Sequence, residues 1–199
     1  MKKHSVNPVK GKQSGLTVSP AYPIFNVIQE DAEMSSKTQK NLAYAFAAES
    51  KASVRNDAFA RKADAEGFAG IARLFRAVSE AESVHAQRYL MLMRGKIGST
   101  EENLEAAFQS EIKANVDEYP NLIKEATAEG EEAALKAFSH ARDVEDRHAE
   151  LYKKAMNDML SERETIYYVC QVCGYVAENE APENCPVCGA VKGKFKKIE

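Results

Sequence analysis

Residues 67–93 read GFAGIARLFRAVSEAESVHAQRYLMLM, and the periodicity of this segment indicates the fold class. Apolar side chains recur at intervals of three and four residues, which is the spacing of one face of an α-helix in a helical bundle. Glu82 and His85 lie on the same face, one helical turn apart. The whole face consists of Phe68, Ile71, Phe75, Val78, Glu82, His85, Tyr89 and Leu92.

A second segment with this pattern follows Gly130. Its apolar face also contains a glutamate and a histidine one turn apart, Glu145 and His148. Both segments belong to an internal repeat, in which Gly67, Glu82 and His85 recur as Gly130, Glu145 and His148. The residues before them repeat as well, since Asn41-Leu42, Phe46 and Glu49 recur as Asn103-Leu104, Phe108 and Glu111. Two helical hairpins of this kind predict an all-α four-helix bundle over residues 36–162.

Capping and turn signals predict where these helices begin and end. Ser36 with Gln39, and Ser99 with Glu102, have the spacing of capping boxes, so we expect helices to begin at the two serines. Other residues are expected to end or bend a helix: Gly67, residues 95–98, Pro120 and Gly130.

The carboxylates on the apolar faces need a compensating charge, because burial of an unpaired charge is strongly unfavourable. No lysine or arginine shares these faces, so two divalent or trivalent metal ions are expected to supply the charge. A ligand set rich in oxygen, with two histidines, suits iron or manganese better than zinc. One glutamate from each of two helices, with Glu-x-x-His from the other two, is the di-iron arrangement of ferritin-like bundles. The predicted ligands are Glu49, Glu82, His85, Glu111, Glu145 and His148.

The four cysteines predict a second metal site in a small domain of short strands and loops, residues 166–199. Cys170 with Cys173, and Cys185 with Cys188, form two Cys-x-x-Cys-Gly motifs, a strong signal for tetrahedral metal binding. Four sulfur ligands suit either zinc in a structural ribbon or one iron in an electron carrier. Attachment to a di-iron bundle, which needs electrons delivered singly, favours iron, with zinc as an alternative in recombinant material.

The composition argues against several classes of partner. The chain has 199 residues, with 27 Lys and Arg against 30 Asp and Glu, and a formal net charge of -3. Nucleic-acid binding needs a basic face that this balance does not supply. No segment reaches the roughly 20 apolar residues of a membrane-spanning helix, and no signal peptide is evident, so we expect a cytoplasmic protein. Residues 1–35 form an N-terminal extension to which we assign no role.

The two sites together resemble those of rubrerythrins, in which a ferritin-like di-iron bundle precedes a rubredoxin-like module. The resemblance covers residues 37–199. It rests on Asn41-Leu-Ala-Tyr-Ala-Phe-Ala-Ala-Glu49-Ser50, Glu82-Ser-Val-His85, Tyr119-Pro120, Glu145-Asp-Arg-His148, Tyr168-Val-Cys170-Gln-Val-Cys173-Gly-Tyr175 and Cys185-Pro-Val-Cys188-Gly-Ala. It implies a non-haem peroxidase of oxidative-stress defence, in which the di-ferrous site reduces hydrogen peroxide to water and the four-cysteine iron returns the electrons.

The resemblance also implies roles for single residues. The catalytic set consists of the six predicted bundle ligands and Tyr119, and the symmetry of the repeat makes Glu82 and Glu145 the bridging ligands. Two positions depart from the family. Ala114 stands where a glutamate that exchanges with a histidine is usual, and Asn56 stands where a tyrosine is common. We therefore expect the exchange to be lost, which leaves peroxide and oxygen both open as the oxidant.

The partners expected are hydrogen peroxide, an electron donor and a second copy of the chain. No Gly-x-Gly-x-x-Gly motif or phosphate-binding loop occurs, so NAD(P)H is expected to act through a separate reductase or rubredoxin. The second and third helices of ferritin-like bundles run parallel over on the order of 30 Å, whereas residues 95–99 reach about 17 Å. We therefore expect a homodimer with exchanged hairpins, in which two chains build each di-metal site, as the family implies for some relatives.

Two other functions stay open at this point. A ferroxidase or iron-handling protein fits the symmetric set of four glutamates and two histidines, and it should bind many more irons than two. A zinc-ribbon interaction module on a helical scaffold fits the four cysteines, and such a protein would be colourless.

Overall fold

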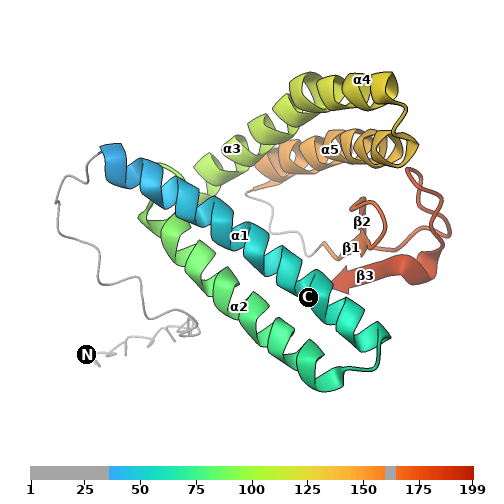
Figure 1. Cartoon of the computed structure of the whole chain (residues 1–199). Helices are drawn as coiled ribbons and strands as arrows, with labels where there is room; N and C mark the ends of the chain where they lie inside the picture. The colour runs from blue at the N-terminus through green and yellow to red at the C-terminus, as the bar shows by residue number, and fades with distance from the viewer. Residues whose placement is uncertain (1–35, 160–164) are drawn as a thin grey trace, which may run out of the picture.

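The computed structural model describes residues 36–159 and 165–199, and its helices form two hairpins (Figure 1). The first hairpin pairs α1, Ser36–Ala65, with α2, Ala69–Leu92. Gly67 lies in the turn between them, and its φ of 84° is in the left-handed region that favours glycine. The expected N-terminal extension lies outside the described residues.

The second hairpin packs α3 and α4 against α5. α3, Thr100–Lys113, continues through a π-helical turn, Ala114–Glu118, into α4, Tyr119–Glu129, and α5 is Glu132–Asp158. The predicted interruption near Pro120 is confirmed. The irregular turn precedes the proline, which lies in the first turn of α4, where no helical hydrogen bond requires its missing N–H.

The helix ends predicted at Ser99 and Gly130 are also confirmed, whereas Ser36 is the first described residue and the capping box predicted there stays a prediction. Ser99 and Glu102 form a reciprocal capping box at the start of α3: the Ser99 hydroxyl accepts from the Glu102 N–H at 3.2 Å, and the Glu102 carboxylate accepts from the Ser99 N–H at 2.7 Å. Gly130 ends α4 in the left-handed conformation. The connection between the two hairpins is therefore restricted to residues 93–99.

The cysteine-containing module is a three-stranded antiparallel sheet with the strand order β2-β1-β3. The strands are β1, Tyr167–Cys170, β2, Val176–Glu178, and β3, Phe195–Ile198. A short 3-10 helix, Lys192–Lys194, leads into β3. The module lies beside α5, which β2 contacts directly (Figure 1).

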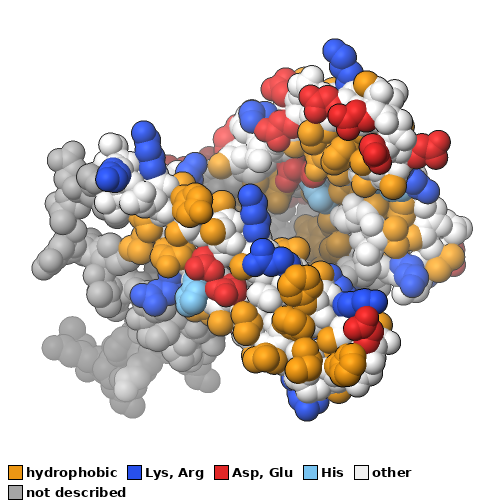
Figure 2. Space-filling model, in the orientation of Figure 1, with side chains coloured by type: hydrophobic (Ala, Val, Ile, Leu, Met, Phe, Trp, Pro, Cys, Tyr) orange, Lys and Arg blue, Asp and Glu red, His pale blue; other side chains and the backbone are white. Residues whose placement is uncertain are grey.

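The single chain buries few large apolar side chains. Among the described residues the buried apolar side chains are mostly alanines, and the largest that is fully buried is Cys170. The apolar face predicted for residues 67–93 is open within one chain, where Phe68 is 59% and Ile71 49% exposed. The reason is that each hairpin packs within itself while the two hairpins diverge, so hydrophobic side chains gather on the open surface of the first hairpin (Figures 1 and 2). None of the described helices has the length and apolar composition needed to cross a membrane.

Candidate metal centres

The first hairpin brings three predicted ligands together in a cluster that we call half-site A. Glu49 of α1 and Glu82 and His85 of α2 each place one potential ligand atom within 4.8 Å of the others. His85 Nδ1 lies 3.2 Å from Glu82 Oε2 and 3.8 Å from Glu49 Oε1. Glu82 and His85 meet because residues three apart share a helix face. The cluster is open to solvent, since the His85 side chain is 50% exposed.

The second hairpin repeats this geometry in a cluster that we call half-site B. Glu111 of α3 and Glu145 and His148 of α5 again lie with their potential ligand atoms within 4.8 Å of one another. His148 Nδ1 lies 3.0 Å from Glu145 Oε2. Half-site B is less exposed than half-site A. Within one chain the six predicted ligands therefore form two clusters of three and not one cluster of six.

Two tyrosines lie close to half-site B. Burial and the charges of Glu145 and Glu111 raise the pKa of Tyr119, the first residue of α4, and hydrogen bonding to Glu145 adds a smaller effect. Burial and the same two carboxylates raise the pKa of Tyr152, one turn after His148. Both phenols therefore keep their protons at neutral pH. The sequence pattern assigns a role to Tyr119 and none to Tyr152.

Each half-site places two glutamate carboxylates close together. Glu49 and Glu82 share a hydrogen bond, which raises the pKa of Glu49 and lowers that of Glu82. Burial, with the hydrogen bond and charge of Glu145, raises the pKa of Glu111 to about 7. Repulsion between the paired carboxylates thus favours a proton in the position that a cation would take. A metal ion held by carboxylate oxygens and the adjacent imidazole nitrogen fits this arrangement, and the donor set suits iron.

The four cysteines form one cluster with the dimensions of a tetrahedral metal site. All four Sγ atoms lie within 4.8 Å of one another. The Cys170 and Cys188 sulfurs are 3.7 Å apart, and those of Cys173 and Cys185 are 3.6 Å apart. A tetrahedron with metal–sulfur bonds of about 2.3 Å has edges of about 3.8 Å, so one metal ion fits between these sulfurs.

Backbone N–H groups point at the sulfurs, as the Cys-x-x-Cys-Gly spacing predicts. Burial opposes ionisation of Cys170, but hydrogen bonds from the N–H groups of Val172 and Cys173 outweigh it and lower the pKa of Cys170. Burial raises the pKa of Cys173, whose thiol therefore needs a metal ion to ionise. Gly174 and Gly189 close the two turns with φ of 86° and 74°.

His148 links half-site B to the four-cysteine cluster. Its Nδ1 faces Glu145, and its Nε2 lies 3.3 Å from the carbonyl oxygen of Gly174, the residue after Cys173. If a metal ion were bound to Nδ1, Nε2 would carry the proton and donate a hydrogen bond to this carbonyl oxygen, which would fix the tautomer and orientation of the ring. The described residues show no corresponding contact between His85 and the module.

The two sequence regions match two known protein profiles. The profile of the rubrerythrin family matches residues 40–156, and that of the rubrerythrin rubredoxin-like domain matches residues 168–196. The chain belongs to the rubrerythrin family. This rubrerythrin is therefore an oxidoreductase of iron-dependent oxidative-stress defence, with a ferritin-like bundle and a rubredoxin-like module, as the motifs predict. Its cofactors are iron: a di-iron site at the carboxylates and histidines, and one iron at the four cysteines.

Similar proteins align with most of this rubrerythrin. Nigerythrin of Nitratidesulfovibrio vulgaris is 32% identical over 184 residues, which cover 86% of this chain and 91% of that protein. The rubrerythrin of Porphyromonas gingivalis is 33% identical over 182 residues, which cover 82% of this chain and 91% of that protein. A solved structure of nigerythrin in a mixed-valence state is 30% identical, with a TM-score of 0.49 over 95% of this chain and 100% of that chain.

Three residues near the metal centres of this rubrerythrin carry no functional signal in the sequence. Arg147 lies inside a Glu-x-x-His motif but has the pattern of a solvated side chain, Gly174 serves the cysteine turn, and Glu178 is one of many acidic residues. The fold shows that Arg147 and Glu178 form an ion pair, at 3.0 Å, between α5 and the module. Such a contact between distant segments follows no local spacing rule.

Proposed function

We propose that the protein is a non-haem di-iron peroxidase, which reduces hydrogen peroxide to water with electrons that a separate NAD(P)H-linked reductase supplies through the four-cysteine iron. The contact of His148 Nε2 with the Gly174 carbonyl, at 3.3 Å, carries this proposal. It joins a carboxylate–histidine cluster to a one-electron carrier within one chain. A structural zinc ribbon would gain nothing from that contact.

The repeat suggests which of the six bundle residues would bind each of the two metal ions. The two half-sites have the same composition and the same Glu-x-x-His geometry. By the symmetry of the repeat, Glu82 and Glu145 would be the ligands shared between the ions, and Glu49 and Glu111 would be the terminal carboxylate ligands. The two histidines would complete the ligand set through Nδ1, the nitrogen that faces the carboxylates.

The chain's own groups position protons and electrons for this reaction. Conversion of hydrogen peroxide to two waters consumes two electrons and two protons, and the two ferrous ions supply the electrons when bound. Tyr119 keeps its proton beside Glu145 and offers a hydrogen-bond donor at half-site B. The hydrogen bond between His148 and Gly174 lies on a route of bonds from the Cys173 sulfur to half-site B, along which electrons return.

We also propose that two chains build each complete di-iron site. α2 has 24 residues and is about 36 Å long. The seven residues 93–99 span at most about 25 Å, so α3 cannot begin at the far end of α2 and run parallel to it. Half-site A of one chain is then completed by half-site B of a second copy, through an exchange of hairpins.

The exposed apolar side chains support a second copy as the missing partner. Tyr44 and Val54 on α1, Leu74 on α2 and Val116 on the second hairpin are all largely exposed. Large apolar side chains exposed in this number are unfavourable in water and are typical of an interface. A second copy both covers the surface and supplies the three ligands that each half-site lacks.

The experiment that tests the peroxidase proposal follows electrons through both centres. Iron-loaded protein is reduced without oxygen and mixed with one equivalent of hydrogen peroxide, while the visible absorption of the ferric four-cysteine centre is recorded. We expect the colour to return rapidly in the wild type and in Glu80→Ala, an exposed residue of α2, but not in Glu82→Ala. Absence of the colour in the wild type would overturn the proposal.

Iron oxidation with oxygen is the second candidate, and Ala114 favours it. This residue begins the π-helical turn, three positions after Glu111, so no further carboxylate occupies the position where one is usual in the family. A symmetric set of four glutamates and two histidines suits oxygen as well as peroxide. Addition of excess Fe(II) in air distinguishes the two, because an iron-handling protein retains many more ions than its two sites per chain explain.

A further inference from the structure

The four-cysteine module lies lengthwise against α5, the helix that carries half-site B. At one end Gly174 lies beside Val144, since a Cβ atom added to the glycine would be 3.8 Å from Val144 Cγ1. The carbonyl oxygen of Gly174 also contacts His148. At the other end Glu178 contacts Lys154. From Val144 to Lys154 the helix advances about 15 Å, and an extended chain from Gly174 to Glu178 covers about 13 Å. The segment therefore follows the helix and holds the Gly174 carbonyl at its start.

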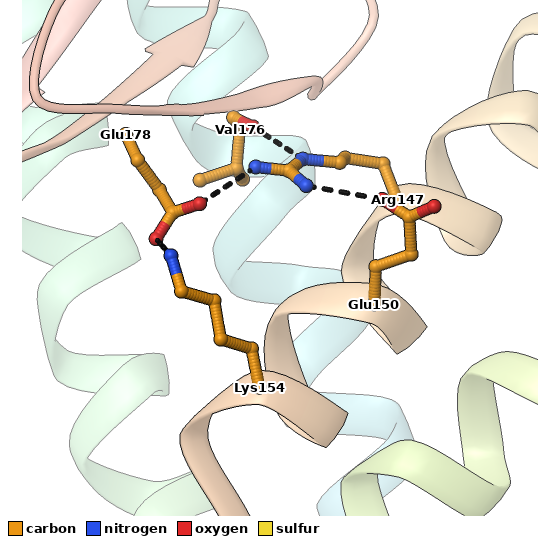
Figure 3. Close-up of polar contacts among 5 residues, drawn as sticks. All are labelled: Arg147, Glu150, Lys154, Val176 and Glu178. Carbon is orange, nitrogen blue, oxygen red and sulfur yellow. Dashed lines mark hydrogen bonds and ion pairs between the residues drawn. The ribbon is translucent and has the colours of Figure 1, made fainter. Parts of the chain in front are cut away.

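Charged side chains join α5 to β2 at Glu178, and we call this group the α5–β2 clasp. It consists of Arg147, Glu150 and Lys154 of α5 and Glu178 of β2 (Figure 3). Arg147 Nη2 donates to Glu178 Oε2 at 3.0 Å, and Lys154 Nζ donates to Oε1 at 2.6 Å. Arg147 is held from two further sides. Its Nε donates to the Val176 carbonyl at 3.3 Å, and its Nη1 donates to Glu150 at 3.0 Å.

The clasp differs from an ordinary surface ion pair. The Glu178 and Arg147 side chains are only 15% and 24% exposed, so water and salt screen their attraction less than that of an exposed pair. Each oxygen of Glu178 accepts from a different cation. Hydrogen bonds from Lys154 and Arg147 also hold the pKa of Glu178 below its usual value, so the carboxylate is ionised at neutral pH.

The side chain of Glu178 serves docking and not the internal structure of the module. Among the described residues its side-chain partners, Arg147 and Lys154, both lie on α5. The module keeps its shape through strand pairing and the four cysteines, so loss of this carboxylate should release the module without unfolding it. Glu183 offers a matched control, because it is an exposed acid whose ion pair with Lys192 stays within the module.

We propose that Glu178 is a positioning residue for electron transfer: by binding Arg147 and Lys154 it docks the module on α5 and sets the Gly174 carbonyl against His148. This inference rests on the proposed function, in which electrons pass from the four-cysteine iron to the di-iron site. Glu178, which belongs to neither set of metal ligands, would then control the rate of this electron transfer.

Paramagnetic NMR tests the docking without any peroxide chemistry. The protein carries Fe(III) at the four cysteines and diamagnetic zinc at the carboxylate–histidine sites, and its amide relaxation rates are compared with those of all-zinc protein. In the wild type the iron should broaden the amide signals of residues 144–154. We expect Glu178→Gln to lose most of this broadening and Glu183→Gln to keep it. Unchanged broadening in Glu178→Gln overturns the proposal.

Rapid kinetics then test the effect on electron transfer. After one equivalent of peroxide, the reduced four-cysteine iron should reoxidise at least about tenfold more slowly in Glu178→Gln than in Glu183→Gln, with the spectrum and potential of that iron unchanged. Lys154→Gln should slow the step as well. The double variant should be no slower than the slower single variant, because both substitutions remove one contact. A normal rate in Glu178→Gln, or fully additive losses, overturns the positioning role.

The failure of this inference and the failure of the proposed function give different results. If the wild type shows no peroxide-dependent reoxidation while Glu178→Gln loses the broadening, the peroxidase proposal fails and docking by the clasp stands. If the wild type reacts with peroxide and Glu178→Gln retains both the broadening and the rate, the clasp inference fails and the peroxidase proposal stands.

Discussion

Ser53 of α1 and Ser79 of α2 each donate a hydrogen bond to the backbone carbonyl of the other. Ser53 Oγ lies 2.9 Å from the Ser79 carbonyl oxygen, and Ser79 Oγ lies 2.8 Å from the Ser53 carbonyl oxygen. Ser53 follows Glu49 by one helical turn, and Ser79 precedes Glu82 by three residues. The serine pair therefore sets the spacing of the two helices next to the carboxylates of half-site A.

Removal of these hydroxyls should weaken the first hairpin. We expect Ser53→Ala and Ser79→Ala each to lower the free energy of unfolding by about 1 kcal/mol, because each substitution removes an interhelical hydrogen bond. Ser83→Ala is the control, since in the described part of the chain its hydroxyl has one hydrogen bond, accepted from the exposed Gln87 side chain, and its effect should stay within about 0.5 kcal/mol. Urea unfolding of metal-loaded protein at one fixed concentration measures all three, and equal losses in Ser79→Ala and Ser83→Ala would contradict the role of the pair.

Exchange of hairpins makes a prediction about mixed dimers. Glu82→Ala damages half-site A and Glu145→Ala damages half-site B, so each variant alone should lack peroxide turnover. In a mixed dimer with exchanged hairpins, one site receives both substitutions and the other receives neither. Coexpression of the two variants should therefore restore about a quarter of the wild-type activity when chains pair at random.

The control for this experiment combines two substitutions in the same half-site. Glu49→Ala with Glu82→Ala leaves every site of every dimer damaged, so coexpression should restore nothing. If Glu82→Ala with Glu145→Ala also restores nothing, although the two tagged chains copurify, each site is built within one chain and the exchange is disproved.

The capping box of α3 predicts a pH effect. Hydrogen bonds from the backbone and then the side chain of Ser99 lower the pKa of Glu102. A carboxylate with a lowered pKa in the folded state stabilises the fold above its unfolded pKa, and this contribution is lost as the pH falls through the folded pKa. A carbon-13 NMR titration should place the Glu102 pKa below its ordinary value. Ser99→Ala should raise it part of the way back, and an unchanged pKa in that variant would show that the hydroxyl has no influence.

Local structure was predictable from the sequence because it depends on residues within a turn of one another. The start of α3 at the Ser99 capping box and the end of α4 at Gly130 follow from such short-range rules. Pro120 predicts an interruption of the helix, but the residue types in the sequence do not indicate that the turn before the proline is π-helical. Whether a helix accommodates an extra residue in this way depends on packing against other helices.

The sequence predicted which residues gather in each candidate site, but not the contacts that connect the two kinds of site. The Glu-x-x-His motifs and the Cys-x-x-Cys pairs keep their ligands close together in the chain, so spacing alone reveals them. Arg147 and Glu178 are 31 positions apart, and the carbonyl that meets His148 belongs to a glycine with an evident turn function. Only the packing of the module on α5 brings these groups together.

The fold of the four-cysteine module should depend on its metal. Among its described residues the buried apolar side chains are Cys170, Ala177, Ala181 and Cys185. Domains below about 40 residues with so small a core seldom fold without a metal or disulfides. We expect Cys185→Ser to remove amide protection from β1, β2 and β3 in hydrogen exchange while α1 and α2 keep theirs. Persistent protection of the strands would show that the module folds without its metal.

A comparison of Tyr119 with Tyr152 distinguishes the effect of hydrogen bonding to half-site B from the effect of lying close to it. The charges of Glu111 and Glu145 raise the pKa of both tyrosines, but hydrogen bonding to Glu145 adds to this effect only for Tyr119. Tyr119→Phe should lower kcat for peroxide by about tenfold or more, because it removes a donor placed at the reacting site. Tyr152→Phe should have a much smaller effect. Iron content, measured for both variants, confirms that the metals are retained. Equal kcat values would show that proximity accounts for whatever effect either tyrosine has.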